Sequence, residues 1–109
     1  MTQPWIAGCG LTTFGRHEGT GLEVLAALAA RAALLDAGLP PRRIGMAVFA
    51  NALAARLSGS LTMGQDVLAH VGIAGCAVMN VENACTSGST AVHIAAMAIR
   101  SDRCCASTG

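Results

Sequence analysis

The chain has 109 residues, of which 53% are hydrophobic and 12% charged, and its formal net charge is +1. Soluble domains usually carry about 25% charged residues. The cations are scattered arginines and aromatic residues make up only 3%, so the chain offers no basic face with stacking rings, which excludes a nucleic-acid partner. No run of about 20 mostly apolar residues is present, so we expect no contact with a membrane. Five cysteines without a disulfide framework favour the cytoplasm.

The hydrophobic pattern predicts alternating strands and helices. In chain order we expect a strand at 6–11, a helix at 22–37, a strand at 44–51, a loop or broken helix at 52–60, a helix at 61–71, a strand at 76–81, a helix at 87–100 and the start of a strand at 103–107. Gly38 and Gly72 are expected to end the first two helices. Such alternation is typical of an α/β fold with a parallel sheet and right-handed crossovers.

The segment Asn83-Ala84-Cys85-Thr86-Ser87-Gly88 is the strongest candidate for a functional site. Cys85 falls between a predicted strand and a predicted helix, and the small residues after it are suited to tight turning and helix capping. A helix start has unpaired N–H groups and the positive end of the macrodipole, which favour the thiolate of a cysteine placed there. Open α/β sheets bind ligands at this carboxyl edge of their strands. We therefore predict covalent catalysis through an acylated Cys85.

The predicted helix after Cys85 carries no charge from residue 86 to residue 99. A helix that is apolar around its circumference requires burial on all sides, whereas a single sheet covers only one side. We therefore expect a second layer of protein that these residues do not supply.

Three short patterns have simpler interpretations than a site. Cys9 and Cys76 are expected to be core thiols. Adjacent Cys104 and Cys105 lack the C-x-x-C spacing, so we expect no metal site. The Gly-x-Gly at 8–10 lacks the third glycine of a dinucleotide-binding turn.

The remaining polar residues are expected to play supporting roles. His93 follows Cys85 by two helical turns, about 12 Å along the axis, which is too far for it to act as its base. We expect it in a core or an interface, His17 in a solvated loop, and His70 near a helix end. Polar side chains at the end of the predicted third strand are expected to hydrogen-bond neighbouring loops or a dimer mate; they are Asn80, Glu82 and Asn83.

Five segments between Ile6 and about Arg103 together carry a family resemblance. They are 6–16, 36–39, 48–52, Gln65 and, most specifically, Asn80-Val81-Glu82-Asn83-Ala84-Cys85-Thr86-Ser87-Gly88-Ser89. The chain resembles the amino-terminal half of the thiolase superfamily, nearest to sterol-carrier-protein-2-type thiolases and acetyl-CoA acetyltransferase-like proteins.

This resemblance implies acyl transfer between coenzyme A thioesters in lipid metabolism, with Cys85 as nucleophile. It implies that the backbone N–H of Cys85 helps to hold the thioester oxygen. The substrate would be an acyl-CoA, with no bound cofactor and no metal. The implied fold is half of an αβαβα arrangement in which the helix after the nucleophile is sandwiched between two sheets, and the implied assembly is a homodimer.

The same resemblance implies that residues 1–109 are an incomplete thiolase-like domain. A full thiolase is several times longer, and its carboxy-terminal half carries a histidine, a second cysteine and a polar motif that have no match here. The ending 102–109 diverges from the apolar strand of the family. We expect that the isolated chain does not complete the catalytic cycle of acyl transfer. The alternative is a non-catalytic fragment or interaction subunit that requires a separate carboxy-terminal half.

Overall fold

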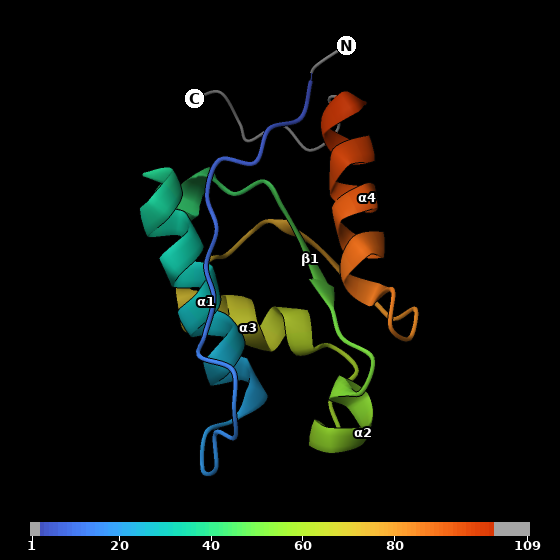
Figure 1. Ribbon diagram of the computed structural model, residues 1–109. Coiled ribbons are helices and arrows are strands. Elements are labelled where there is room, and N and C mark those ends of the chain that lie inside the picture. The colour runs from blue at the N-terminus through green and yellow to red at the C-terminus, as the bar shows by residue number, and fades with distance from the viewer. Residues whose placement is uncertain (1–2, 102–109) are drawn as a thin grey trace.

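The computed structural model describes residues 3–101 and has the predicted α/β fold (Figure 1). In chain order its elements are α1 (Leu22–Ala37), a 3-10 helix η1 (Pro41–Arg43), β1 (Met46–Ala50), α2 (Ala54–Ser58), α3 (Met63–Val71), β2 (Ala77–Val81) and α4 (Ser87–Arg100). The strand expected at 103–107 and the pair Cys104-Cys105 lie outside the described residues. No helix within 3–101 is long and apolar enough to cross a membrane.

Glycines end the first three α-helices. Gly38 follows α1 with φ 68°, Gly59 follows α2 with φ 76°, and Gly72 follows α3 with φ 85°. A residue without a Cβ adopts this left-handed conformation at little cost, and its N–H then satisfies a carbonyl of the last turn. The predicted bounds of α1 are confirmed at both ends, and the stretch expected to be loop or broken helix contains α2.

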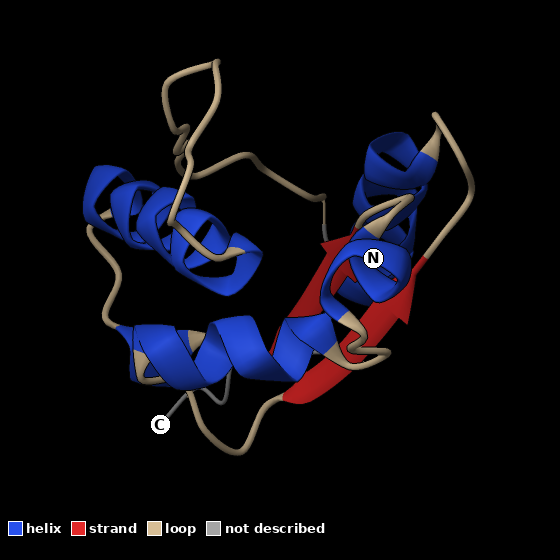
Figure 2. Ribbon diagram, turned by 90° about the horizontal axis from the view of Figure 1, so that it is seen from below, coloured by secondary structure: helices blue, strands red, loops and turns tan. Residues whose placement is uncertain are grey.

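The strands β1 and β2 form a parallel pair, in register from Met46↔Ala77 to Ala50↔Val81. Because the strands are parallel, both carboxyl ends lie at the same edge of the sheet. The connection between them contains α2 and α3; α3 packs on one face of the pair, and α4 packs on the other (Figure 2). The long helix α1 packs against α3 rather than directly on the sheet. This layering leads the chain from the end of β2 directly into α4.

The strand expected at 6–11 is absent, and that prediction is wrong. This segment runs along α1 instead of pairing with β1 or β2 (Figure 1). The N–H of Cys9 donates to Asp36 Oδ2 at 2.9 Å, and a Cβ added at Gly8 would lie 2.5 Å from the carbonyl oxygen of Ala33. The glycines of the segment therefore permit close contact with a helix backbone. Cys9 is also exposed, contrary to the expected core position.

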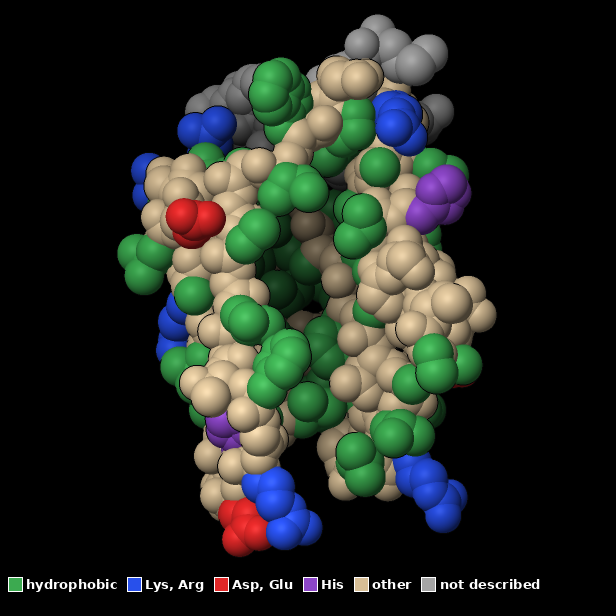
Figure 3. All heavy atoms as spheres, in the orientation of Figure 1, with side chains coloured by type: hydrophobic (Ala, Val, Ile, Leu, Met, Phe, Trp, Pro, Cys, Tyr) green, Lys and Arg blue, Asp and Glu red, His purple; other side chains and the backbone are tan. Residues whose placement is uncertain are grey.

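The core is small and lies where α3 meets α1, α2 and β1. Its buried residues are Ala27, Ala54, Met63, Val67 and Val71. Large hydrophobic side chains remain exposed elsewhere, and the molecule is hollowed between α4 and the N-terminal segment, with hydrophobic groups on the walls (Figure 3).

The helix α4 is covered by β1 and β2 on one side only. On α4, Val92 is 66% exposed and Met97 is 47% exposed. The prediction that the described residues do not enclose this helix is confirmed.

Candidate functional site

Cys85 lies in the loop that joins β2 to α4, at the carboxyl edge of the sheet. Val81 ends β2, Thr86 is the N-cap of α4, and Cys85 directly precedes this cap. The thiol is free and its residue is exposed. The predicted placement between a strand end and a helix start is therefore confirmed.

Short hydrogen bonds fix the backbone immediately before Cys85. Ala84 has φ 49°, and its N–H donates to Glu82 Oε2 at 2.5 Å. The hydroxyl of Ser87 donates to the carbonyl of Ala84 at 2.7 Å and accepts the N–H of Asn83 at 2.8 Å. Ser87 is 5% exposed, so these bonds are shielded from water. The cysteine is thus presented by a turn with a defined shape.

The first turn of α4 has no side-chain cap, contrary to the capping role expected of Thr86. The hydroxyl of Thr86 instead donates back to the carbonyl of Asn83 at 2.8 Å. The Asn83 side chain in turn donates to Thr90 Oγ1 at 3.0 Å. The N–H of Ser87 donates to the carbonyl of Ala84 at 3.2 Å. The N–H groups of Gly88 and Ser89 in the first turn are left for another acceptor, and such groups favour negative charge at a helix N-terminus.

Asn80 ties β2 to the beginning of α3. Its Oδ1 accepts the N–H of buried Gly64 at 2.7 Å, and its Nδ2 donates to Gln65 Oε1 at 2.8 Å. Gln65, which the sequence analysis named only as part of the family resemblance, accepts this bond and thereby fixes the orientation of the Asn80 amide. Asn80 therefore binds helix α3, whereas Glu82 binds Ala84 of its own loop and Asn83 binds Ser87 and Thr90 of α4. The expected hydrogen bonds exist, but they go to helices and to the same loop rather than to neighbouring loops.

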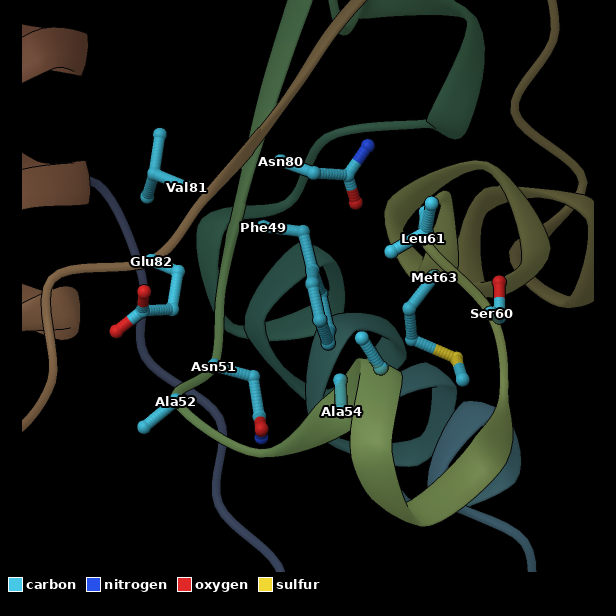
Figure 4. A pocket seen from close by; sticks show the side chains of 11 residues that line it. Phe49, Asn51, Ala52, Ala54, Ser60, Leu61, Met63, Asn80, Val81 and Glu82 are labelled. Carbon is cyan, nitrogen blue, oxygen red and sulfur yellow. The ribbon is translucent and has the colours of Figure 1, made fainter.

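A cavity of about 150 Å³ opens at the carboxyl ends of both strands. Phe49 and Met63 form apolar walls, and Asn51 and Glu82 contribute polar atoms (Figure 4). Glu82 belongs to this wall and also holds the N–H of Ala84. The cavity and the cysteine loop therefore share a side chain, and both lie at the edge where α/β sheets bind ligands.

The histidines are not gathered at Cys85. His17 Nε2 hydrogen-bonds the carbonyl of Thr13 at 2.7 Å, and the carbonyl of His70 accepts from Arg31. His93 is exposed on α4. Within residues 3–101 no histidine is hydrogen-bonded to the thiol, so the described site supplies an exposed thiol and a helix terminus without a paired base.

A family model described as "Thiolase, N-terminal domain" matches residues 5–107. The benzoylsuccinyl-CoA thiolase subunit BbsB of Thauera aromatica is 37% identical over 93 residues, covering 84% of this chain and 23% of that protein. Sterol carrier protein 2 of Gallus gallus is 31% identical over 93 residues, covering 83% of this chain and 16% of that protein. The chain therefore spans less than a quarter of the length of these relatives.

Solved structures share the fold. The 3-oxoacyl-(acyl-carrier-protein) synthase III of Aquifex aeolicus superposes with a TM-score of 0.75 at 21% identity, over 94% of this chain and 33% of that one. The Ltp2-ChsH2(DUF35) aldolase gives a TM-score of 0.70 at 29% identity, over 90% of this chain and 24% of that one. The described residues thus have the architecture of one part of these longer proteins.

Proposed function

The chain belongs to the thiolase family, in the part described as its N-terminal domain, and from this premise we propose that Cys85 accepts an acyl group from a coenzyme A thioester. The single observation that carries the proposal is the position of the thiol. It is exposed, it lies at the carboxyl edge of the sheet, and it precedes a helix whose first turn has no side-chain cap.

In the proposed step the thiolate sulfur of Cys85 attacks the carbonyl carbon of the thioester. A new carbon–sulfur bond forms to Cys85, the carbonyl oxygen becomes negative, and the bond to the coenzyme A sulfur then breaks. The leaving sulfur takes the electron pair and receives a proton from solvent. The backbone N–H of Cys85 and the N-terminus of α4 stabilise the negative oxygen.

We propose that residues 1–109 act as an incomplete N-terminal domain, with 102–109 diverging from the family, and that further steps need a separate carboxy-terminal half. Two observations support this. The chain spans 23% and 16% of the two relatives, and one side of α4 is uncovered within the described residues. A homodimer, a role in lipid metabolism and a cytoplasmic location stay predictions.

The test is transfer of an isotope-labelled acetyl group from acetyl-CoA to the full chain, with the label located by peptide mass spectrometry. We expect the label on Cys85, its loss in Cys85→Ala and its release by hydroxylamine, which cleaves thioesters. Cys9→Ala is the matched control, because Cys9 is also an exposed free cysteine.

Equal labelling of Cys85 and Cys9 would refute the proposal and favour the alternative of a non-catalytic fragment or interaction subunit. Adding a candidate carboxy-terminal half and acetoacetyl-CoA then measures whether turnover appears. Turnover that persists in Cys85→Ala would also count against the assigned nucleophile.

A further inference from the structure

The residue before the proposed nucleophile has an unusual backbone. Ala84, with φ 49°, is the only residue other than glycine with a positive φ in the described part of the chain. An L-residue is disfavoured in this region because its Cβ crowds the following carbonyl oxygen. Such a conformation persists only where the surrounding structure imposes it, and it is concentrated at functional sites.

Both backbone polar groups of Ala84 are hydrogen-bonded, and a side chain takes part in each case. Glu82 Oε2 accepts the N–H, and the carbonyl accepts the Ser87 hydroxyl at 2.7 Å as well as the Ser87 backbone N–H at 3.2 Å. Ser87 also accepts the N–H of Asn83 at 2.8 Å, so a single hydroxyl bonds to the residues on both sides of the Asn83–Ala84 peptide.

Among the described residues Ser87 is the only polar residue that is buried, and it is 5% exposed. Glu82 is exposed, so its bond competes with water, whereas the Ser87 bonds do not. The buried hydroxyl is therefore the stronger of the two side-chain restraints on the conformation of Ala84, and it adds the bond to the Asn83 N–H that the backbone of Ser87 does not supply.

We infer that Ser87 is a positioning residue for Cys85: it holds Ala84 in the left-handed conformation and thereby fixes the direction in which the cysteine leaves the turn. The inference rests on the proposed function of Cys85. A relaxed Ala84 would rotate the next peptide plane and move the thiol away from the N-terminus of α4, whose positive end favours the thiolate.

The test measures the rate of alkylation by iodoacetamide at each cysteine of the full chain, by peptide mass spectrometry at neutral pH. We expect Ser87→Ala to slow Cys85 by about two- to fivefold, the factor that corresponds to losing a helix-terminus charge interaction. Rates at Cys9 and Cys76 should not change. Ser89→Ala is the matched control, because the Ser89 hydroxyl lies in the same turn but bonds only the carbonyl of Thr86.

A second substitution separates positioning from general support of the fold. Ala84→Gly combined with Ser87→Ala should recover most of the Cys85 rate, because glycine adopts a positive φ without the restraint. Loss of a purely structural hydrogen bond would not be compensated in this way.

Exposed Glu82 tests separately whether the conformation of Ala84 sets the reactivity of Cys85, which is the step on which the role of Ser87 depends. Glu82→Ala removes the bond to Ala84, whereas Glu82→Gln keeps an acceptor oxygen and removes only the charge. We expect the alanine variant to react more slowly at Cys85 than the glutamine variant.

The outcomes distinguish this inference from its premise. If wild-type Cys85 reacts fast and Ser87→Ala matches Ser89→Ala, the positioning role is overturned and the proposed function stands. Failure of glycine to restore the rate also overturns it. If wild-type Cys85 reacts no faster than Cys9, the proposed function and this inference are both overturned.

Discussion

Two glycines at equivalent helix positions should differ in how the same substitution changes the stability of the protein. Gly64 is the second residue of α3, and Gly88 is the second residue of α4. A Cβ at Gly64 would lie 2.8 Å from Asn80 Oδ1 and 2.9 Å from the Cβ of Phe49, whereas a Cβ at Gly88 would meet nothing within 4 Å. Alanine at either site gains up to about 1 kcal/mol of helix propensity. At Gly64 the added methyl group also overpacks the α3–sheet contact, at a cost of about 1–3 kcal/mol.

The difference between the two variants isolates the packing term, because the propensity gain is shared. We expect Gly88→Ala to be at least as stable as the wild type, and Gly64→Ala to be less stable than Gly88→Ala by about 1–3 kcal/mol. For a domain of this size this corresponds to a midpoint lower by at least about 4 °C in thermal unfolding followed by circular dichroism. Equal midpoints for the two variants would refute the close approach of α3 to β1 and β2.

Other substitutions test the core, a buried hydrogen bond and a surface ion pair. Met63→Ala, at 3% exposure, should lower the free energy of unfolding by about 2–5 kcal/mol in urea titrations, whereas Val92→Ala, at 66% exposure, should change it by less than about 0.5 kcal/mol. Asn80→Ala leaves the buried N–H of Gly64 without its acceptor, so we expect a loss of about 1–3 kcal/mol and faster hydrogen exchange at that amide. Glu18→Gln should not move the thermal midpoint, because the ion pair it removes is 3.8 Å long and its Glu18 side chain is 84% exposed.

The helices were predictable because the residues that end them lie next to them in the sequence. The apolar spacing of residues 22–37 and the glycine at 38 specify α1 without knowledge of the rest of the fold. The strand predicted at 6–11 failed for the opposite reason. A strand requires a hydrogen-bonded neighbour, and an apolar, glycine-containing segment fits equally well against a helix such as α1.

The position of the candidate nucleophile in the fold was predictable to the level of one residue. Composition and order place Cys85 between β2 and α4, and the structure confirms that position. The left-handed Ala84 was not predictable, because alanine gives no sign of a positive φ. The role of Ser87 was equally hidden, since a serine at a helix start usually indicates capping and here its hydroxyl turns back to the preceding loop.

The two-stranded sheet has a practical consequence for work with this polypeptide. Within residues 3–101, β1 and β2 pair only with each other, so each has one lateral row of amide and carbonyl groups without a strand beside it. Such rows recruit further strands from other molecules and can seed fibrils. Concentrated preparations should therefore precipitate more readily than dilute ones, and a binding partner that covers either row should keep the sample in solution.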